Sequence, residues 1–544
     1  MFFNTRLLFG NLSTVAALGL FAGSGVYAGQ YGYDEEVTVT AARTPLDPMS
    51  TMAATTVINS NDIETGQARD LPDALRRLSG IEFDDNGGRG ALSSIKVRGT
   101  EADHVLFLVD GIRVSDASSG ATSIQSIPLA HIERIEIVRG PRSSLYGADA
   151  LGGVIQVFTK SGQQASSAAE PSARLEYGSH NRRDSEAGVL GRAGNFFYRV
   201  GGGYEETNGI NRTVGSAGAD LDRDSYRETS YAASAGYNFA EYAGRSTQLR
   251  LGYTGAQGKS EFDSGADDDH IDFNNGVGYL RLQGAAHQTL GYALTLGYSE
   301  DDQRTRGAFP ANFKTTRDSA NLQFDYRVAS ASQLLFGLDY YLDKVASSAN
   351  FIDDERGNDA FYVQYLGDYG LVDLQLGFRH DNNQAFGEKT TGNIALGFNP
   401  SEHLMVSVSH GSAFKAPTFN DMFFPFTDFG FGFTFEGNPD LQPESSTTTE
   451  LLVKAAFDAI SGYVSLYRTE VEDLIASTAT TVENIAEADI SGADLGVEFV
   501  VGGVLTQLGL AYVDAENAKS GERLPRRART TATLDLSKRI AAID

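Results

Sequence analysis

The chain contains no cysteine and no tryptophan, and only 8 of its 544 residues are histidine. The lack of cysteine excludes disulfide bonds and thiol catalysis, and together with the few histidines it argues against a zinc site. The motifs GxSxG, HExxH and the P-loop are also missing. We therefore predict that the protein is not an enzyme.

Positive charge is scarce, because 44 Lys and Arg residues stand against 71 Asp and Glu residues, which gives a net charge of −27. Nucleic-acid binding needs a basic surface, so this class of protein is excluded. An acidic balance usually reflects a solvated surface, although acidic loops can also attract divalent cations.

A long apolar run occurs only in the first 28 residues, which we interpret as a signal peptide. Arg6 precedes an apolar run over residues 12–26, and the segment ends on Val26-Tyr27-Ala28. No later stretch offers the roughly 18 apolar residues of a transmembrane helix. An exported chain without disulfides favours a large hydrogen-bonded scaffold.

Residues 51–162 have a mixed pattern of helix and strand. DLPDALRRLSGIEF (70–83) has helical periodicity, with Gly80 as its C-cap. Short strands are predicted at IKVRG (95–99), HVLFLVDGIRV (104–114) and IERIEIVRG (132–140). The second of these is apolar almost throughout and contains an Asp-Gly turn, which indicates a buried hairpin. The polar stretch at 161–172 predicts a linker.

From residue 163 onward the chain repeats alternating segments separated by turns or by acidic, Gly-rich loops. Examples are ARLEYG (173–178), YRVGGGY (198–204), TSYAASAGYNF (229–239), QLRLGY (248–253), YALTLGY (292–298), LMVSVSHG (404–411), GYVSLYR (462–468) and QLGLAY (507–512). This pattern is typical of a transmembrane antiparallel β-barrel, with the 24 Tyr and 32 Phe supplying the aromatic girdles. A soluble sandwich, propeller or β-helix is the alternative, but no fixed repeat period supports it.

Three long motifs are similar to those of a known family. SSIKVRGTEADHVLFLVDGIRV (93–114) and HIERIEIVRGPRSSLYGADALGGVIQVFTK (131–160) resemble the plug domain of TonB-dependent outer-membrane receptors. GSAFKAPTFNDMF with GNPDLQPESS (411–446) resembles their barrel signature. Within the family, RGTEADHVL, GPRSSLYGADALGGV and LPRRART (524–530) are most similar to the cobalamin transporters.

The resemblance implies a monomeric barrel in outer-membrane lipid, of about 22 strands, with an α+β plug inside its lumen. The implied organisation is a signal peptide (1–28), a TonB-box segment (29–50), a plug (51–162) and a barrel (163–544). The last residues, RIAAID (539–544), come several strands before the end of the family's barrel. We therefore expect roughly 18 strands, with a gap or a strained closure beside the first.

EEVTVTAAR (35–43) has the composition of a strand but no hairpin partner nearby. In the family this position holds the TonB box, an unpaired strand that pairs with the edge of TonB's C-terminal sheet. The resemblance thus implies TonB as a partner, through Glu36, Val37, Thr38, Val39, Thr40 and Ala41. A disordered tail after the leader is the alternative.

Three classes of ligand are candidates for transport by this protein. Haem receptors of the family place a histidine between the two barrel motifs, and residues 411–446 contain none. Ferric siderophores are mostly anionic, which suits acidic loops poorly. Cobalamin is bulky and roughly neutral, so we predict TonB-dependent cobalamin uptake. A ferric-siderophore receptor is the alternative, and a passive porin, which needs neither plug nor TonB box, is more remote.

By the same resemblance, cobalamin contacts in the plug fall in DNGGRGALS (85–93) and RVSDASSG (113–120). The residues expected to make them are Asn86, Arg89, Leu92, Asp116 and Ser118. The alternative is that these are ordinary turn residues.

The acidic stretches ADLDRDSY (219–226) and EFDSGADDDHIDF (261–273) are candidates for calcium binding. An EF-hand is excluded, because its required glycine and its twelfth-position glutamate are missing. In cobalamin receptors, aspartates of two neighbouring loops bind calcium and order the ligand site. The matching positions are Asp222, Asp224, Asp263 and Asp272, whereas Asn211 replaces a family aspartate.

An ion-pair lock between plug and barrel is also expected. Arg98 and Arg139 each end a plug strand, and Glu450 and Glu498 each interrupt an alternating barrel strand. Because guanidinium groups stay charged and bind carboxylates bidentately, we predict that these four residues form one buried cluster.

Overall fold

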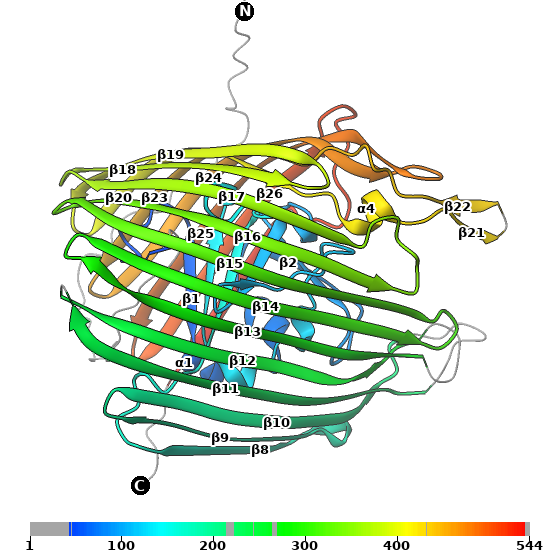
Figure 1. The fold of residues 1–544 in the computed structure, drawn as a ribbon, viewed down its shortest axis with the longest axis horizontal. Helices are drawn as coiled ribbons and strands as arrows, with labels where there is room; N and C mark the ends of the chain where they lie inside the picture. The colour runs from blue at the N-terminus through cyan, green and yellow to red at the C-terminus, as the bar shows by residue number, and fades with distance from the viewer. Residues whose placement is uncertain are drawn as a thin grey trace, which may run out of the picture.

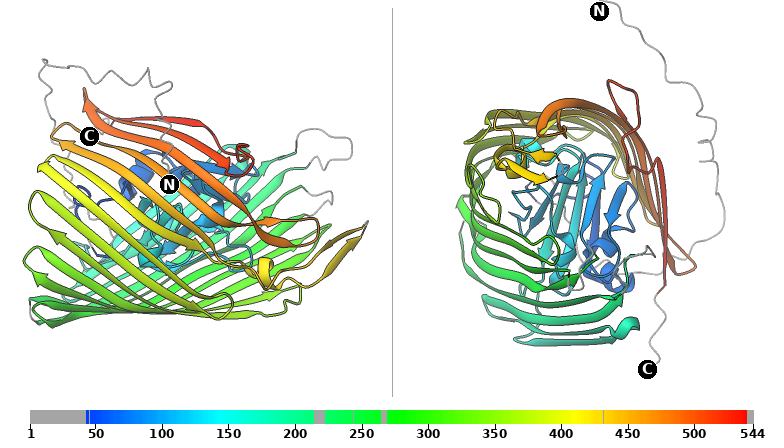
Figure 2. Two further views of the ribbon diagram at one scale, coloured as in Figure 1. Left: turned by 90° about the horizontal axis from the view of Figure 1, so that it is seen from above. Right: turned by 90° about the vertical axis from the view of Figure 1, so that its right-hand side faces the viewer.

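The computed structural model describes residues 43–538, except for residues 45, 214–221, 243, 264–268 and 431. A ring of long strands encloses a smaller N-terminal domain (Figure 1; Figure 2, right). In the described part of the chain, no helix is both long and apolar enough to cross a membrane. The predicted signal peptide and TonB box lie outside the described residues.

The enclosed domain, the plug, contains one five-stranded sheet of order β1-β6-β7-β4-β5 and a two-stranded sheet, β2-β3. Its strands are β1 (Thr55–Asn59), β2 (Ile81–Asp85), β3 (Ser93–Val97), β4 (Val105–Val109), β5 (Ile112–Arg113), β6 (Ile132–Arg139) and β7 (Gly153–Thr159). Its helices are α1 (Ser60–Thr65), α2 (Leu71–Leu75), α3 (Ser143–Tyr146) and the 3-10 turns η1 (Ala102–His104), η2 (Ile124–Ser126) and η3 (Leu129–His131). β4 and β7 pair in parallel, and the other neighbours in the five-stranded sheet are antiparallel.

The three predicted plug strands are present, and the Asp110-Gly111 turn joins β4 to β5 with positive φ at both residues. Only Gly adopts this backbone readily, with Asp among the better substitutes, which is why the pair specifies a tight hairpin. β4 is buried along its whole length. The plug core is formed mainly by such apolar strand residues, including Ile135, Ile137, Ile155 and Val157.

The helix predicted to end at Gly80 is shorter than expected. α2 begins at its N-cap Asp70, whose side chain accepts from the Asp73 N–H, but it ends at Leu75, with Arg76 as its C-cap. Gly80 has positive φ, but it lies in the turn before β2 instead of capping the helix. Residues 81–85 form β2, with Ile81 opposite Val97 of β3.

The barrel has eighteen strands in the order β10 through β20, β23 through β27, then β8 and β9. They are β8 (Glu170–Tyr177), β9 (Arg183–Ala193), β10 (Phe196–Ile210), β11 (Asp224–Tyr242), β12 (Arg245–Glu261), β13 (His270–His287), β14 (Leu290–Arg306), β15 (Ala311–Ala329), β16 (Ser332–Ser347), β17 (Glu355–Asp368), β18 (Val372–Asn383), β19 (Gly387–Ser401), β20 (Leu404–Lys415), β23 (Glu444–Phe457), β24 (Ile460–Ser477), β25 (Val482–Val501), β26 (Val504–Asn517) and β27 (Thr530–Ser537). A turn, η4 (Ser179–Asn181), lies between β8 and β9, and the β20–β23 connection contains α4 (Phe419–Phe423), β21 (Thr427–Gly430) and β22 (Phe433–Phe435). Every alternating segment singled out in the sequence lies within one of these strands, except that Gly178 of the first segment follows the end of β8.

Alternation along the strands separates an apolar outer face from an inner face that meets the plug. In β19, Ile394, Leu396 and Phe398 are exposed on the outside, while Ala395 between them is buried. On the inner face, Asn393 Oδ1 accepts a hydrogen bond of 2.6 Å from Ser144 Oγ of the plug. A period of two along a strand produces this separation.

The two rims of the barrel differ. Connections at one rim are short, as between β13 and β14 or between β25 and β26. Most of those at the other rim are longer, as between β10 and β11 or between β20 and β23. Barrels of bacterial outer membranes place short turns in the periplasm and longer loops outside. The longer connections therefore mark the extracellular rim.

The ring closes by placing β27 beside β8. Residue-by-residue registers join every other pair of neighbours, but no register is defined between described residues of β27 and β8. The expected strand number is confirmed. The strand order closes here, but without a register between these two strands the expectation of a gap or a strained closure stays a prediction.

Candidate functional site

Two plug loops reach the extracellular half of the lumen, and they contain the predicted ligand contacts. In the first loop the Asn86 N–H donates to the Leu92 carbonyl at 3.2 Å, which closes residues 86–92 into a compact turn. Asn86 is exposed, and Leu92 has an exposed fraction of 55%. Both side chains are thus accessible to a ligand entering from outside.

Arg89 contacts the barrel wall instead of facing solvent. Its Nη2 lies 2.7 Å from Glu205 Oε2 and its Nη1 lies 3.3 Å from Asp70 Oδ2. The guanidinium also lies 4.7 Å from the ring centroid of Tyr226. These contacts occupy much of the hydrogen-bonding capacity of Arg89. In this structure Arg89 therefore mainly anchors the loop.

In the second loop, Asp116 and Ser118 bind each other. Ser118 Oγ donates to Asp116 Oδ1 at 2.7 Å, and Thr315 Oγ1 of β15 donates to the same oxygen at 2.6 Å. Ser118 is only 1% exposed. The pair fixes the loop against the wall, and Asp116, half-buried, is the more accessible of the two.

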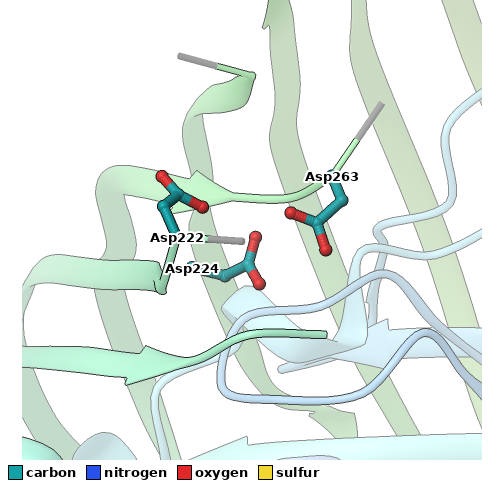
Figure 3. A group of neighbouring side chains, drawn as sticks. All are labelled: Asp222, Asp224 and Asp263. Carbon is teal, nitrogen blue, oxygen red and sulfur yellow. The ribbon is translucent and has the colours of Figure 1, made fainter. Parts of the chain in front are cut away.

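Three of the four predicted calcium residues lie together at the extracellular rim. Oxygen atoms of Asp222, Asp224 and Asp263 all lie within 4.8 Å of one another. Asp222 comes from the β10–β11 connection, Asp224 is the first residue of β11, and Asp263 comes from the β12–β13 connection. Their carboxylates converge (Figure 3). Both Asp263 oxygens are buried, and within the described residues neither has a hydrogen-bond partner.

Asp272 is not part of this cluster, which corrects the prediction. It lies within β13, and its carboxylate is 3.8 Å from both His270 and Arg306. Asn211 binds locally, because its Oδ1 accepts from the Thr213 N–H at 2.8 Å. The cluster therefore consists of three aspartates from two neighbouring loops.

Arg98 forms the centre of a buried ion-pair cluster between plug and wall. Its Nη2 lies 2.9 Å from Glu450 Oε1, and its Nε lies 2.9 Å from Asp494 Oδ2. Ser465 Oγ accepts from Arg98 at 2.9 Å and donates to Glu450 at 2.6 Å. The side chains of Arg98 and Glu450 are each 4% exposed.

The other two predicted members, Arg139 and Glu498, have different partners. Arg139 donates to Thr56 Oγ1 at 2.8 Å and to the Ser79 carbonyl at 3.3 Å, because β1 covers this end of β6. Glu498 accepts from Gln507 Nε2 at 2.7 Å on the barrel wall. The prediction of one four-membered lock is wrong for these two residues, and Asp494 takes the place given to Glu498.

A second ionic contact joins the plug motif RGTEADHV to the wall. His104 Nε2 lies 2.7 Å from Glu444 Oε2, and Lys415 Nζ lies 2.8 Å from Asp103 Oδ2. Burial alone would lower the pKa of His104, but the facing Glu444 carboxylate raises it above its ordinary value. The sequence analysis did not identify this contact.

A third contact, also not predicted, involves Arg43, the last residue of the stretch EEVTVTAAR. Arg43 Nη2 lies 3.1 Å from Asp339 Oδ2 of β16. Its guanidinium lies 4.9 Å from the ring centroid of Tyr146 in the plug and 4.5 Å from that of Tyr362 in the wall. Asp339 also pairs with Arg379. The start of the described chain is thus fixed to both plug and barrel.

Comparison with known proteins gives matches over both domains. Residues 47–154 match a family profile described as "TonB-dependent Receptor Plug Domain", and residues 163–539 match "TonB dependent receptor-like, beta-barrel". The vitamin B12 transporter BtuB of Vibrio cholerae serotype O1 is 33% identical over 520 residues, which cover 92% of this chain and 81% of that protein. BtuB of Photobacterium profundum is 29% identical over 542 residues, covering 97% and 86%.

Solved structures show the same fold at lower identity. A mutant form of the ferric enterobactin receptor PfeA of Pseudomonas aeruginosa has a TM-score of 0.75 at 17% identity, covering 93% of this chain and 86% of that one. The FrpB iron transporter of Neisseria meningitidis has a TM-score of 0.74 at 15% identity, covering 89% and 84%. At these identities the similarity concerns the fold alone.

Proposed function

Since the chain belongs to the family of TonB-dependent outer-membrane receptors, we propose that it imports cobalamin-type corrinoids across the outer membrane. The family consists of transporters and receptors rather than enzymes, and its members work with TonB. The observation that carries the choice of ligand is the 33% identity to a vitamin B12 transporter over 92% of the chain. A ferric-siderophore receptor is the second candidate, because receptors for such ligands share this fold.

The geometry of the lumen supports active rather than passive passage. The plug occupies the inside of the ring (Figure 2, right), and ion pairs hold it to the wall. A ligand bound at the extracellular loops cannot cross without movement of the plug. In our proposal TonB pairs with residues 36–41 and pulls on them, and the force first reaches Arg43.

We further propose that Asp222, Asp224 and Asp263 hold a calcium ion that orders the ligand site. Carboxylate oxygens are the donors that calcium prefers, and the two buried oxygens of Asp263, which have no hydrogen-bond partner among the described residues, fit a cation. The cluster is linked to the first plug loop by Arg212. Its backbone N–H donates to Asp224 at 2.8 Å, and its Nη2 donates to the Arg89 carbonyl at 3.0 Å. Ordering of the cluster would thus be transmitted to the loop.

Calorimetric titration of the purified protein tests the ligand. We expect cyanocobalamin to bind with a dissociation constant at least about a hundredfold lower than any member of a ferric-siderophore panel, a difference of about 2.7 kcal/mol. Tight binding of a siderophore and none of cyanocobalamin would replace the first candidate by the second.

Calcium should strengthen cyanocobalamin binding, and Asp263→Asn should remove this effect. Coupling between two linked sites is typically worth roughly 5- to 150-fold in affinity, and we expect a value in this range. The titrations are run with calcium and with a chelator. Asp272→Asn is the matched control, because Asp272 lies outside the cluster and its loss should leave the calcium effect intact. Equal affinity of the unaltered protein in both buffers would remove calcium from the proposal.

A further inference from the structure

The connection between β20 and β23 contains an unusual concentration of phenylalanine. Residues 423–435 read FFPFTDFGFGFTF. The connection folds into α4 and a hairpin of β21 and β22, in which Thr427 lies opposite Phe435. Phe426, Phe429 and Phe433 have exposed fractions of 63%, 55% and 57%. We call these three side chains the aromatic patch.

The base of the hairpin is rigid. Phe419 is fully buried and Phe423 nearly so, in an apolar cluster that also contains Ala117 of the second plug loop. The Phe424 and Phe435 rings pack against each other with their centroids 5.6 Å apart. The Gly437 N–H donates to the Phe424 carbonyl at 2.9 Å. An isolated two-stranded hairpin is marginal in water, so this base holds the aromatic patch in position.

The helix α4, which leads into the hairpin, is hydrogen-bonded to the loop that contains Asp116 and Ser118. At the start of α4, the Phe419 N–H donates to the Ala117 carbonyl and the Asn420 N–H donates to the Ser118 carbonyl, both at 3.0 Å. A ligand that contacts the aromatic patch therefore acts on an element hydrogen-bonded to the plug.

The position of the hairpin restricts what can cover it. It projects beyond the extracellular rim (Figure 1), and in the view along the barrel it lies within the outline of the wall (Figure 2, right). The hairpin that contains the patch thus lies over the mouth of the lumen, beyond the rim of the barrel. Contiguous exposed apolar surface of this kind marks a binding site.

The charge of the connection indicates the chemistry of the occupant. Residues 416–443 contain no Lys or Arg, whereas Asp421, Asp428, Glu436 and Asp440 are acidic. An anionic ligand such as a ferric siderophore gains nothing from this surface. A large, roughly neutral ligand with an apolar face does, because phenylalanine rings pack on flat or methyl-bearing surfaces.

We propose that Phe429 and Phe433 form a ligand-binding surface that packs against an apolar face of the corrinoid macrocycle at the mouth of the barrel. This inference rests on the proposed function. The centroids of the two rings lie 5.5 Å apart, so the rings form one continuous surface on the hairpin. They act together with the plug loops, which supply polar contacts from below.

Calorimetry with cyanocobalamin on the full-length double variant Phe429→Ser/Phe433→Ser tests the proposal. Loss of two aromatic contacts should weaken binding about tenfold or more. Phe429→Tyr/Phe433→Tyr keeps both rings and should bind like the unaltered protein. Phe309→Ser is the matched control, because Phe309 is 77% exposed in another extracellular connection.

The outcomes separate this inference from the proposed function. If the unaltered protein binds cyanocobalamin and the double serine variant binds it within twofold, the aromatic patch is not a ligand surface and the inference fails alone. If the unaltered protein binds only a ferric siderophore, the proposed ligand fails. If the double serine variant then binds the siderophore more weakly, the aromatic patch is a ligand-binding surface, but its ligand is the siderophore and not a corrinoid.

Discussion

Replacing Val39 by proline is expected to abolish uptake of cyanocobalamin while leaving its binding at the cell surface unchanged. Proline lacks the backbone N–H and disrupts a strand that must pair along its length. The proposed TonB box precedes Arg43 in the sequence and includes none of the predicted ligand contacts, so we expect binding not to depend on it. Uptake of labelled cyanocobalamin by cells, compared with a strain that lacks TonB, provides the measurement.

A proline at Gln30, in the same segment but ahead of the box, is the matched control and should leave uptake intact. Uptake at the normal rate by the Val39→Pro protein would show that residues 36–41 are not the site at which TonB pulls.

The second large effect is expected from the cluster around Arg98. Glu450→Ala together with Asp494→Ala removes both carboxylates and leaves a buried cation without a counter-charge, at a cost of about 3–5 kcal/mol in the free energy of unfolding of the plug. Each single change should cost less, because Arg98 keeps one carboxylate. Denaturant titration measures the loss, and entry of a large antibiotic into cells reports a loosened plug.

Glu498→Ala serves as the control for this experiment. Glu498 also lies on β25, but it binds Gln507 instead of Arg98, so its removal should change the stability by no more than about 0.5 kcal/mol. A double variant as stable as the unaltered protein would mean that the cluster does not hold the plug. Cyanocobalamin affinity should change little in any of these variants.

The sequence was informative wherever a pattern is local. A period of two along the chain predicted the barrel strands, and the Asp110-Gly111 pair predicted its hairpin, because both signals depend only on adjacent residues. The segment 70–83 shows the limit of such reasoning. Its helical pattern extends to Gly80, yet α2 ends at Leu75, and turns lead from there into β2, which pairs with β3.

The ionic contacts could be predicted only in part, because their partners are far apart in the sequence. Arg43 and Asp339 are separated by 296 residues, and no local pattern connects them. The prediction of Glu498 was wrong for a simpler reason, and Asp494 was not considered. Both lie on one face of β25, but Asp494 is opposite Ser465, whereas Glu498 is opposite Ser461, about 13 Å further along the strand.

The metal candidates show the same limit. Alternate spacing placed Asp222 and Asp224 on one segment, and the structure brings Asp263 beside them from the next loop. Asp272 matched the acidic pattern equally well, but it belongs to β13, where the strand directs its carboxylate toward His270 and Arg306. Asp224 is also a strand residue, but it begins β11 at the rim, whereas Asp272 is the third residue of β13.

The unequal rims of the barrel determine where this protein can change during evolution. An insertion or deletion in a short turn, such as that between β25 and β26, would shift the register by a residue and exchange the faces that meet lipid and plug. A long connection begins only after the ladder of strand pairs has ended, so it can lengthen at small entropic cost. New ligand specificities can thus arise by remodelling one rim, while the opposite rim keeps the fold unchanged.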